Sequence, residues 1–202
     1  MAGHAQKPVN RVVGGMVLAF LALFVAMVAW PVAQGSNSDA ALAQAPADAP
    51  RMVLTLKDGE VVFALRPDLA PNHVARITEL ANSGFYDGLN FHRVITGFMA
   101  QTGDPLGNGT GGSDLPNLEA EFSNENFVRG TLGMARSMAP NSANSQFFIV
   151  TADSPHLNGQ YTLFGEVVEG MEFVDNIEQG DPRANGVVQN PDQMISLRVI
   201  EE

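Results

Sequence analysis

Short apolar runs separated by turn residues dominate the chain beyond residue 50. The first two, Met52–Leu56 and Glu60–Leu65, flank the sequence Lys57-Asp58-Gly59. Asp-Gly between two such runs predicts a hairpin, because a tight hairpin turn favours positive φ. Six further runs have the length and composition of strands: Phe91–Ile95, Phe98–Thr102, Thr131–Ala135, Phe147–Thr151, Leu163–Val168 and Ile195–Glu201. Eight short strands with turns between them predict a mainly β fold, a closed eight-stranded antiparallel barrel.

Two segments have helical rather than strand periodicity. Pro71 suits the first position of a helix, and Gly84 favours a helix end before it. The second segment is Gly170–Ile177. Apolar residues recur at helical spacing in both segments: Val74, Ile77 and Leu80 in the first, and Phe173, Val174 and Ile177 in the second. The sequence therefore predicts two short helices beside the strands.

An uncharged apolar segment precedes these elements. Residues 12–33 hold no Lys, Arg, Asp or Glu over 22 positions, which matches the roughly 20 residues that a helix needs to cross a bilayer. Lys7 and Arg11 come before it, so the positive-inside rule places residues 1–11 in the cytoplasm. The sequence thus predicts an uncleaved single-pass anchor in the membrane, which in a bacterium is the inner membrane, with the domain beyond it in the periplasm.

A cleaved signal peptide is the alternative interpretation of the same segment. Signal peptides have a shorter apolar core, about 7–15 residues, and a small-x-small cleavage site close to it. Ala41-Leu42-Ala43 offers such a site, but well beyond the apolar end. Cleavage after Ala43 would leave a soluble periplasmic protein. Residues 34–50, rich in Ala, Pro, Ser, Asp and Gln, predict a flexible linker, which leaves residues 51–202 as the folded domain.

Composition narrows the classes of chemistry and partner. The 202-residue chain has a formal net charge of −11, and the first 50 residues are formally neutral, so the domain carries all of it. Nucleic-acid binding is disfavoured, because phosphate neutralisation requires basic clusters. The absence of cysteine excludes disulfides and thiolate chemistry. His73, His92 and His156 lack the spacing of a zinc site, so we expect no metal.

The segment Phe91–Pro105 carries the strongest candidate chemistry. Side chains two apart on a strand share a face, so Arg93 can stand beside an apolar pocket built partly from Phe98 and Met99, with Gln101 nearby. A fixed guanidinium next to a small apolar pocket, with no nucleophile and no metal ligands, suits a reaction that makes no covalent bond. Rotation about the peptide bond before a proline is such a reaction.

Two downstream motifs strengthen this interpretation: Asn144-Ser145-Gln146-Phe147-Phe148-Ile149-Val150 and Leu163-Phe164-Gly165-Glu166-Val167. Together with the first segment they resemble the cyclophilin family of peptidyl-prolyl cis-trans isomerases, here in a bacterial, exported or membrane-anchored form. The resemblance extends from about Met52 to about Ile200. It implies a barrel with a helix over each open end, proline-containing polypeptide clients and no cofactor. We expect a monomer.

The resemblance also implies the site residues. Arg93 and Gln101 take the catalytic positions, with Arg93 as a hydrogen-bond donor to the prolyl nitrogen. The substrate-binding positions are Phe98, Met99, Gly109, Ala135, Arg136, Gln146, Phe148, His156, Leu157 and Tyr161. Of these, Phe98, Met99, Phe148 and Leu157 would form the proline pocket.

The chain departs from the best-known eukaryotic cyclophilins at the rim of this pocket. His156 stands where they carry Trp, Tyr161 where they carry His, and Arg136 where they carry Asn. Isomerase chemistry is expected to survive, because Arg93 and the pocket residues remain. Cyclosporin affinity is put in doubt, because the missing Trp contributes to binding of that drug.

A glycine-rich stretch offers a competing motif. Gly107–Gly112 satisfies G-x-G-x-x-G, the dinucleotide fingerprint, which requires a helix immediately after it. Ser113-Asp114-Leu115-Pro116 follows instead, which is typical of a loop. We therefore expect a loop at the edge of the substrate groove.

Two functions remain in competition. The first is a prolyl isomerase that assists protein folding outside the cytoplasm. The second is a chaperone or scaffold module that holds proline-containing segments, with catalysis incidental. The intact set around Arg93 favours the enzyme, because a pure binding module would not need it.

Overall fold

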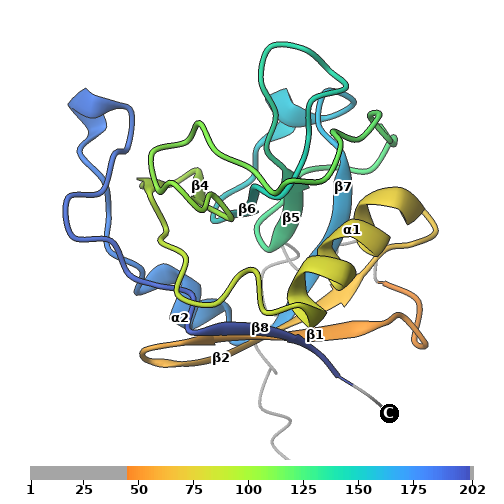
Figure 1. The fold of residues 1–202 in the computed structure, drawn as a ribbon, viewed down its shortest axis with the longest axis horizontal. Helices are drawn as coiled ribbons and strands as arrows, with labels where there is room; N and C mark the ends of the chain where they lie inside the picture. The colour runs from red at the N-terminus through yellow and green to blue at the C-terminus, as the bar shows by residue number, and fades with distance from the viewer. Residues whose placement is uncertain (1–44, 201–202) are drawn as a thin grey trace, which may run out of the picture. The chain divides into compact units, whose positions relative to one another are not determined.

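The computed structural model describes residues 45–200 (Figure 1). The predicted cytoplasmic segment 1–11, the predicted anchor 12–33 and most of the predicted linker 34–50 lie outside the described residues. Within residues 45–200, none of the helices has the length and apolar character needed to cross a membrane.

One curled antiparallel sheet of eight strands forms the body of the domain. Its strands lie in the order β3-β4-β6-β5-β7-β2-β1-β8. Their bounds are β1 Arg51–Leu56, β2 Gly59–Leu65, β3 Arg93–Ile95, β4 Met99–Thr102, β5 Thr131–Met134, β6 Phe147–Val150, β7 Leu163–Glu169 and β8 Ser196–Val199. All eight predicted strands are confirmed, each within two residues at either end.

The two edge strands of the sheet, β3 and β8, are not joined by a ladder within residues 45–200. Loop segments next to them close the gap. Asn90 and Gln193 form an isolated antiparallel bridge, and the Phe91 N–H donates to the carbonyl of Asp192 at 2.9 Å. The prediction of a closed barrel is therefore confirmed in its coarser form, an eight-stranded curled antiparallel sheet.

Two helices accompany the sheet, as predicted. Helix α1 (Pro71–Asn82) packs against β8 and β7, and α2 (Met171–Asp175) packs against β2 (Figure 1). Pro71 occupies the first turn of α1, and Gly84 has a φ of 74° just beyond its end. The face of α1 that faces the sheet contains His73, Val74, Arg76, Ile77, Leu80 and Ala81.

The first hairpin is confirmed, but for a different physical reason than the expected turn geometry. Gly59 belongs to β2 and pairs with Leu56, and none of Lys57, Asp58 and Gly59 has positive φ. A Cβ on Gly59 would lie 2.5 Å from the ring of Phe173. Glycine is therefore required here because α2 approaches the backbone closely, not because the turn is left-handed.

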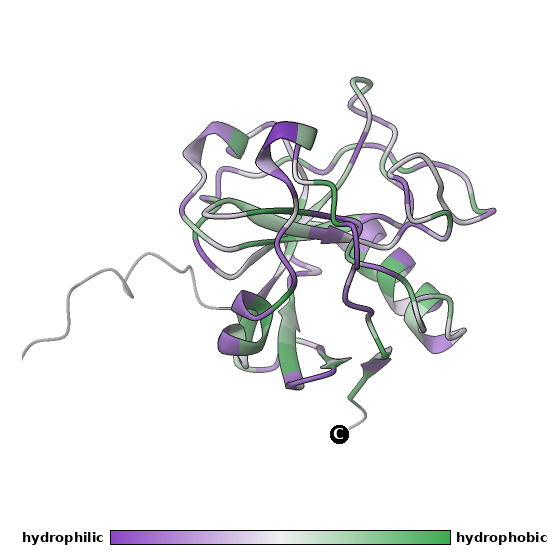
Figure 2. Ribbon diagram, turned by 90° about the vertical axis from the view of Figure 1, so that its left-hand side faces the viewer, coloured by the Kyte–Doolittle hydropathy of each residue, from purple (hydrophilic) through white to green (hydrophobic). Residues whose placement is uncertain are grey.

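The sheet separates two apolar clusters, and adjacent residues of β6 belong to different ones. Phe147 lies in the larger cluster, where its ring meets Phe63, Tyr86 and Phe164 edge-on. Phe148 lies in the smaller cluster, the one next to the groove. Figure 2 shows the hydrophobic strands in the interior and the hydrophilic turns around them. Adjacent residues of β6 therefore serve different purposes: Phe147 packs in the main core, and Phe148 faces the substrate groove, the side to which the resemblance assigned it.

Candidate active site

The β3–β4 hairpin places the two predicted catalytic residues opposite each other. Arg93 on β3 is the cross-strand partner of Gln101 on β4, where facing side chains lie close enough to interact. The Nη1 group of Arg93 donates a hydrogen bond to Oε1 of Gln101 at 3.1 Å. The short strands thus fix the guanidinium against a neutral acceptor.

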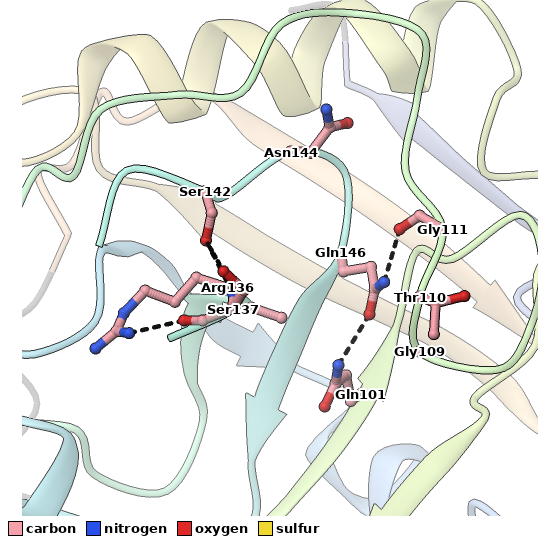
Figure 3. Close-up of a pocket in the computed structure, with 10 residues that line it drawn as sticks. Gln101, Gly109, Thr110, Gly111, Arg136, Ser137, Ser142, Asn144 and Gln146 are labelled. Carbon is pink, nitrogen blue, oxygen red and sulfur yellow. Dashed lines mark hydrogen bonds between the residues drawn. The ribbon is translucent and has the colours of Figure 1, made fainter. Parts of the chain in front are cut away.

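A directed chain of hydrogen bonds continues from Gln101 across the sheet (Figure 3). The Nε2 group of Gln101 donates to Oε1 of Gln146 at 2.9 Å. The Nε2 group of Gln146 in turn donates to the carbonyl of Gly111 at 2.8 Å. Each amide accepts on one side and donates on the other, so the orientation of both side chains is determined by the guanidinium at one end and by the carbonyl at the other.

Asn185, which the sequence motifs did not indicate, provides the other contacts of Arg93. The Nε group of Arg93 donates to the backbone carbonyl of Asn185 at 3.0 Å, and Nη2 donates to Oδ1 at 3.1 Å. Within residues 45–200, Asn185 is the one residue other than glycine with positive φ, 54°. The pair Asn185-Gly186 could have predicted a left-handed turn, but nothing in the sequence links that turn to Arg93.

The guanidinium of Arg93 keeps its charge although it is half-buried. Burial lowers its pKa, and the nearby Tyr161 hydroxyl opposes this effect. An arginine remains protonated under such a shift because its ordinary pKa lies far above physiological pH. All three acceptors around it are neutral oxygens. The site therefore presents a fixed positive charge that no carboxylate in the described part of the chain neutralises.

A pocket of about 150 Å³ lies beside this charge, and it is called the apolar pocket because aromatic and aliphatic side chains make up most of its wall. Its walls include all four residues of the predicted proline pocket. The lining consists of Arg93, Phe98, Met99, Gln101, Ala135, Arg136, Phe148, Leu157 and Tyr161. All nine lining residues are among the site residues that the sequence predicts.

The back wall of the apolar pocket depends on two residues that the sequence did not reveal. The ring of Phe127 stacks on Phe148 at a centroid distance of 6.0 Å. Gly133 faces Phe148 across β5 and β6, and a Cβ on it would lie 2.3 Å from Cζ of Phe148. Phe148 can occupy its place only because residue 133 has no side chain. No local pattern marks either residue, since both act through packing between distant strands.

A second, polar pocket of about 180 Å³ adjoins the first (Figure 3). It contains four predicted residues not in the catalytic pair: Gly109, Ala135, Arg136 and Gln146. The remaining lining is Gln101, Thr110, Gly111, Ser137, Ser142 and Asn144. The two pockets share Gln101, Ala135 and Arg136, and so they form one continuous groove.

The glycine-rich stretch forms a loop at the edge of the polar pocket, as predicted. Asp104 holds this loop: its carboxylate accepts backbone N–H groups of Leu106, Asn108 and Gly109 at 2.8, 3.0 and 2.6 Å. Burial of Asp104 would raise its pKa, but these donors outweigh the burial and lower it. The loop is therefore built around a buried carboxylate, not around a phosphate.

His156 is the predicted binding residue that does not line either pocket. Its ring lies 5.1 Å from the ring of Phe98, in a tilted arrangement. It thus contacts the pocket wall from outside. Within residues 45–200, no group of three or more His, Cys, Asp or Glu residues could hold a metal ion.

Comparison with known proteins identifies this arrangement. The model of the family described as cyclophilin type peptidyl-prolyl cis-trans isomerase/CLD matches residues 51–199. The chain belongs to the cyclophilin family. A probable peptidyl-prolyl cis-trans isomerase of Brucella suis is 58% identical to this cyclophilin over 159 residues, 73% of this chain and 81% of that protein. Peptidyl-prolyl cis-trans isomerase B of Bacillus subtilis is 48% identical over 128 residues, 62% and 89% of the two chains.

Solved structures agree with this assignment. The crystal structure of a Cryptosporidium parvum cyclophilin type peptidyl-prolyl cis-trans isomerase matches with a TM-score of 0.70 at 28% identity, covering 76% of this chain and 99% of that one. A structure of the same C. parvum protein in the presence of the dipeptide Ala-Pro matches with a TM-score of 0.68, at 28% identity and over 75% and 99% of the two chains. As a member of this family, the cyclophilin described here is a peptidyl-prolyl cis-trans isomerase.

Proposed function

We propose that this cyclophilin isomerises X-Pro bonds by donating a hydrogen bond from Arg93 to the prolyl nitrogen. The observation that carries the mechanism is the position of Arg93: its guanidinium lines the apolar pocket and is held there by neutral acceptors. Three of its N–H groups are engaged by Gln101 and Asn185. A guanidinium has five N–H groups, so two remain for the substrate.

The barrier that the enzyme must lower arises from the partial double bond of the amide. Rotation about it requires about 18–20 kcal/mol. As the bond twists, the nitrogen becomes pyramidal and its lone pair localises, so that it can accept a hydrogen bond that the planar amide cannot. A donor at that nitrogen stabilises the twisted state more than the planar one, which is the condition for catalysis.

The free energy of one hydrogen bond limits how much of the rate acceleration Arg93 can supply. A hydrogen bond to a charged group is worth about 1.5–3 kcal/mol, and each factor of ten in rate requires about 1.4 kcal/mol. Arg93 thus accounts for one to two decades. The rest must come from holding the twisted geometry in a groove that excludes water.

The two pockets divide the substrate between them. The apolar pocket takes the proline ring against Phe98, Met99, Phe148 and Leu157. Gln101 and the backbone near Ala135 hold the flanking peptide in the polar pocket. One side of the X-Pro bond is then fixed while the other rotates. This division of roles needs neither metal nor cofactor.

A refolding assay distinguishes this enzyme from the rival, a chaperone or scaffold that holds proline-containing segments. The substrate is a protein whose slow refolding phase is limited by a non-native X-Pro isomer. The full chain should accelerate that phase at substoichiometric concentration, and Arg93→Ala should lose the acceleration. If Arg93→Ala assists refolding as well as wild type, and only at stoichiometric concentration, the binding module is correct.

We further propose that the domain works in the periplasm, attached to the inner membrane as a monomer by residues 12–33. The uncharged length of this segment and the preceding Lys7 and Arg11 support this topology. Protease added to spheroplasts should then digest the domain, and the protein should stay with the membranes after an alkaline wash. If N-terminal sequencing finds that the protein starts at Gln44, and the protein is in the soluble fraction, the segment is a cleaved signal peptide and not an anchor.

A further inference from the structure

Most cationic side chains in the described part of the chain form ion pairs. Nine Lys and Arg residues fall within residues 45–200. Five of them are paired with carboxylates at 4.0 Å or less: Lys57, Arg66, Arg129, Arg183 and Arg198. The four without a carboxylate include both arginines of the groove, Arg93 and Arg136. A protein with a net charge of −11 thus keeps two unneutralised cations at its active site.

The second of these cations, Arg136, is held rigidly at the rim shared by the two pockets. Its Nε and Nη2 groups donate to the carbonyl of Gln160 at 3.0 and 2.8 Å. Its Nη1 group donates to the carbonyl of Ser137 at 2.9 Å (Figure 3). Its Cζ lies 4.5 Å from the ring centroid of Tyr161, which lines the apolar pocket. An arginine fixed in this way loses little conformational freedom when it binds an anion.

Arg136 retains the capacity to bind a further acceptor. Its three engaged N–H groups serve neutral carbonyls, and the guanidinium has two more. A planar guanidinium stacked on an aromatic ring and bonded only to carbonyls is a strong site for a carboxylate, because charge-assisted hydrogen bonds are about twice as strong as neutral ones.

No carboxylate of the described residues occupies the groove next to the free N–H groups of Arg136. Neither pocket is lined by Asp or Glu. Asp104 lies beneath the polar pocket, but it is buried and saturated by backbone N–H groups of its own loop. Asp114 and Glu119 are exposed on a neighbouring loop and do not line the groove. The groove is therefore locally positive within an acidic domain.

We propose that this cyclophilin favours clients with an Asp or Glu side chain within about two residues of the proline, and that Arg136 binds that carboxylate. This inference rests on the proposed function, because it assumes that the proline ring occupies the apolar pocket. A residue spans at most about 3.3–3.6 Å of extended chain, so the residues next to the proline must pass the shared rim of the pockets, where Arg136 lies.

The test measures kcat/KM of the full chain on short X-Pro peptides blocked at both ends, so that the varied side chain is the sole carboxylate. Glu, Gln and Lys are compared at the two positions before and the two positions after the proline. At one or more positions we expect the Glu peptide to exceed the Gln peptide about three- to tenfold, with the Lys peptide below Gln.

Variants assign the preference to Arg136. Arg136→Gln should bring the ratio of Glu to Gln close to one, whereas Arg136→Lys should keep part of it. Arg51→Gln is the matched control, because it removes the same charge from an exposed arginine without a carboxylate partner, on β1 away from the groove; its ratio should equal that of wild type. The ratio compares two peptides on one enzyme, so a general loss of turnover in a variant does not affect it.

Each of three possible results would refute a different claim. Equal turnover of the Glu, Gln and Lys peptides by the wild type would refute the acidic preference and leave the isomerase intact. A preference that survives Arg136→Gln would refute the role of Arg136. A folded wild type that isomerises none of the peptides would refute the proposed function itself.

Discussion

Arg93 and Asn185 lie 92 positions apart in the sequence and share two hydrogen bonds, one to the backbone carbonyl and one to the side chain of Asn185. With the bond to Gln101, these contacts fix the plane of the guanidinium. The loop that carries Asn185 is joined to β3 by the bridge between Arg93 and Val187. The direction of the catalytic donor therefore depends on a loop near the C-terminal end of the domain.

Replacing Asn185 by glycine should weaken catalysis while leaving the fold intact. Glycine accepts the φ of 54° and keeps the backbone carbonyl, so the change removes only the Oδ1 acceptor of Arg93. Loss of one hydrogen bond to a charged group should lower kcat by up to about tenfold, with KM nearly unchanged. Asn190→Gly, at an exposed position near the same loop, is the control. Unchanged kcat in Asn185→Gly would mean that Gln101 and the backbone carbonyl of residue 185 suffice to position the guanidinium.

Phe147 and Phe148 should respond differently to truncation, although they are neighbours. Phe147→Ala should lower the free energy of unfolding by about 3–5 kcal/mol, because a fully buried ring is removed from the main core. Phe148→Ala should act mainly on the substrate, raising KM at least tenfold, because its ring lines the apolar pocket. Urea unfolding and peptide kinetics on both variants test this. A larger stability loss in Phe148→Ala would contradict the separation of the two clusters.

Gly133→Ala should distort the apolar pocket, because residue 133 packs against the ring of Phe148 on the side away from the substrate. The new Cβ would lie 2.3 Å from Cζ of Phe148 and 2.7 Å from Cε1 of Phe127, so the Phe148 ring must move into the apolar pocket. We expect kcat/KM on an X-Pro peptide to fall about tenfold or more, an effect of the size that misplacement of binding groups produces. The same variant with Phe148→Leu should recover part of the activity, because the smaller side chain leaves room. Wild-type kinetics in Gly133→Ala would show that the strands can separate without moving the ring.

The strands and helices could be predicted because each depends on local pattern, whereas most of the lining of the apolar pocket was predicted through the resemblance to cyclophilins. Alternation placed Arg93 and Gln101 beside the predicted pocket, the hairpin between β3 and β4 brought the two together, and the resemblance placed Phe148 in the groove. Asn185, Phe127 and Gly133 escaped prediction for one physical reason. Each acts through a contact between segments distant in the sequence, and no periodicity records such contacts.

Two further differences concern backbone geometry. Gly59 was expected to serve a left-handed turn, whereas it makes room for Phe173. The barrel was expected to close through strand pairing, whereas loop residues near Asn90 and Gln193 span the gap. Sequence patterns show where a glycine or a strand lies. They do not show which distant residue packs against that glycine or strand, and this contact explains why it is needed.

The stability of the domain should decline as pH falls from 7.5 to 5.5. Burial lowers the pKa of His73, against the opposing effect of Glu121, and burial likewise lowers that of His92. The unfolded chain, with histidine pKa values near 6.5, then binds protons before the folded state does. The contribution of the two neutral histidines to the free energy of unfolding is therefore complete above about pH 6.5, and it is lost as pH falls toward their lowered pKa values. The lowered pKa of Asp104 acts only at still lower pH.

Urea unfolding at several pH values measures this dependence, and His92→Phe isolates one contribution. Within residues 45–200, no hydrogen bond of ordinary geometry reaches either ring nitrogen of His92, and the backbone of Asn90 only partly offsets the effect of burial on its pKa. Phenylalanine therefore removes the titrating group while retaining an aromatic ring. The slope of unfolding free energy against pH should be smaller in His92→Phe than in wild type. An equal slope would assign the pH dependence to His73 or to other groups.

Arg93 is the centre of the proposed mechanism, and its replacement is the most direct test. The measurement is the catalysed exchange between cis and trans isomers of an X-Pro peptide by the full chain, with wild type, Arg93→Lys and Arg93→Ala compared after circular dichroism has established that each is folded. We predict that Arg93→Ala loses one to two decades of kcat/KM, and that Arg93→Lys recovers only part of this, because an ammonium lacks the planar geometry that Gln101 and Asn185 hold. Turnover by folded Arg93→Ala within a factor of two of wild type would contradict the mechanism.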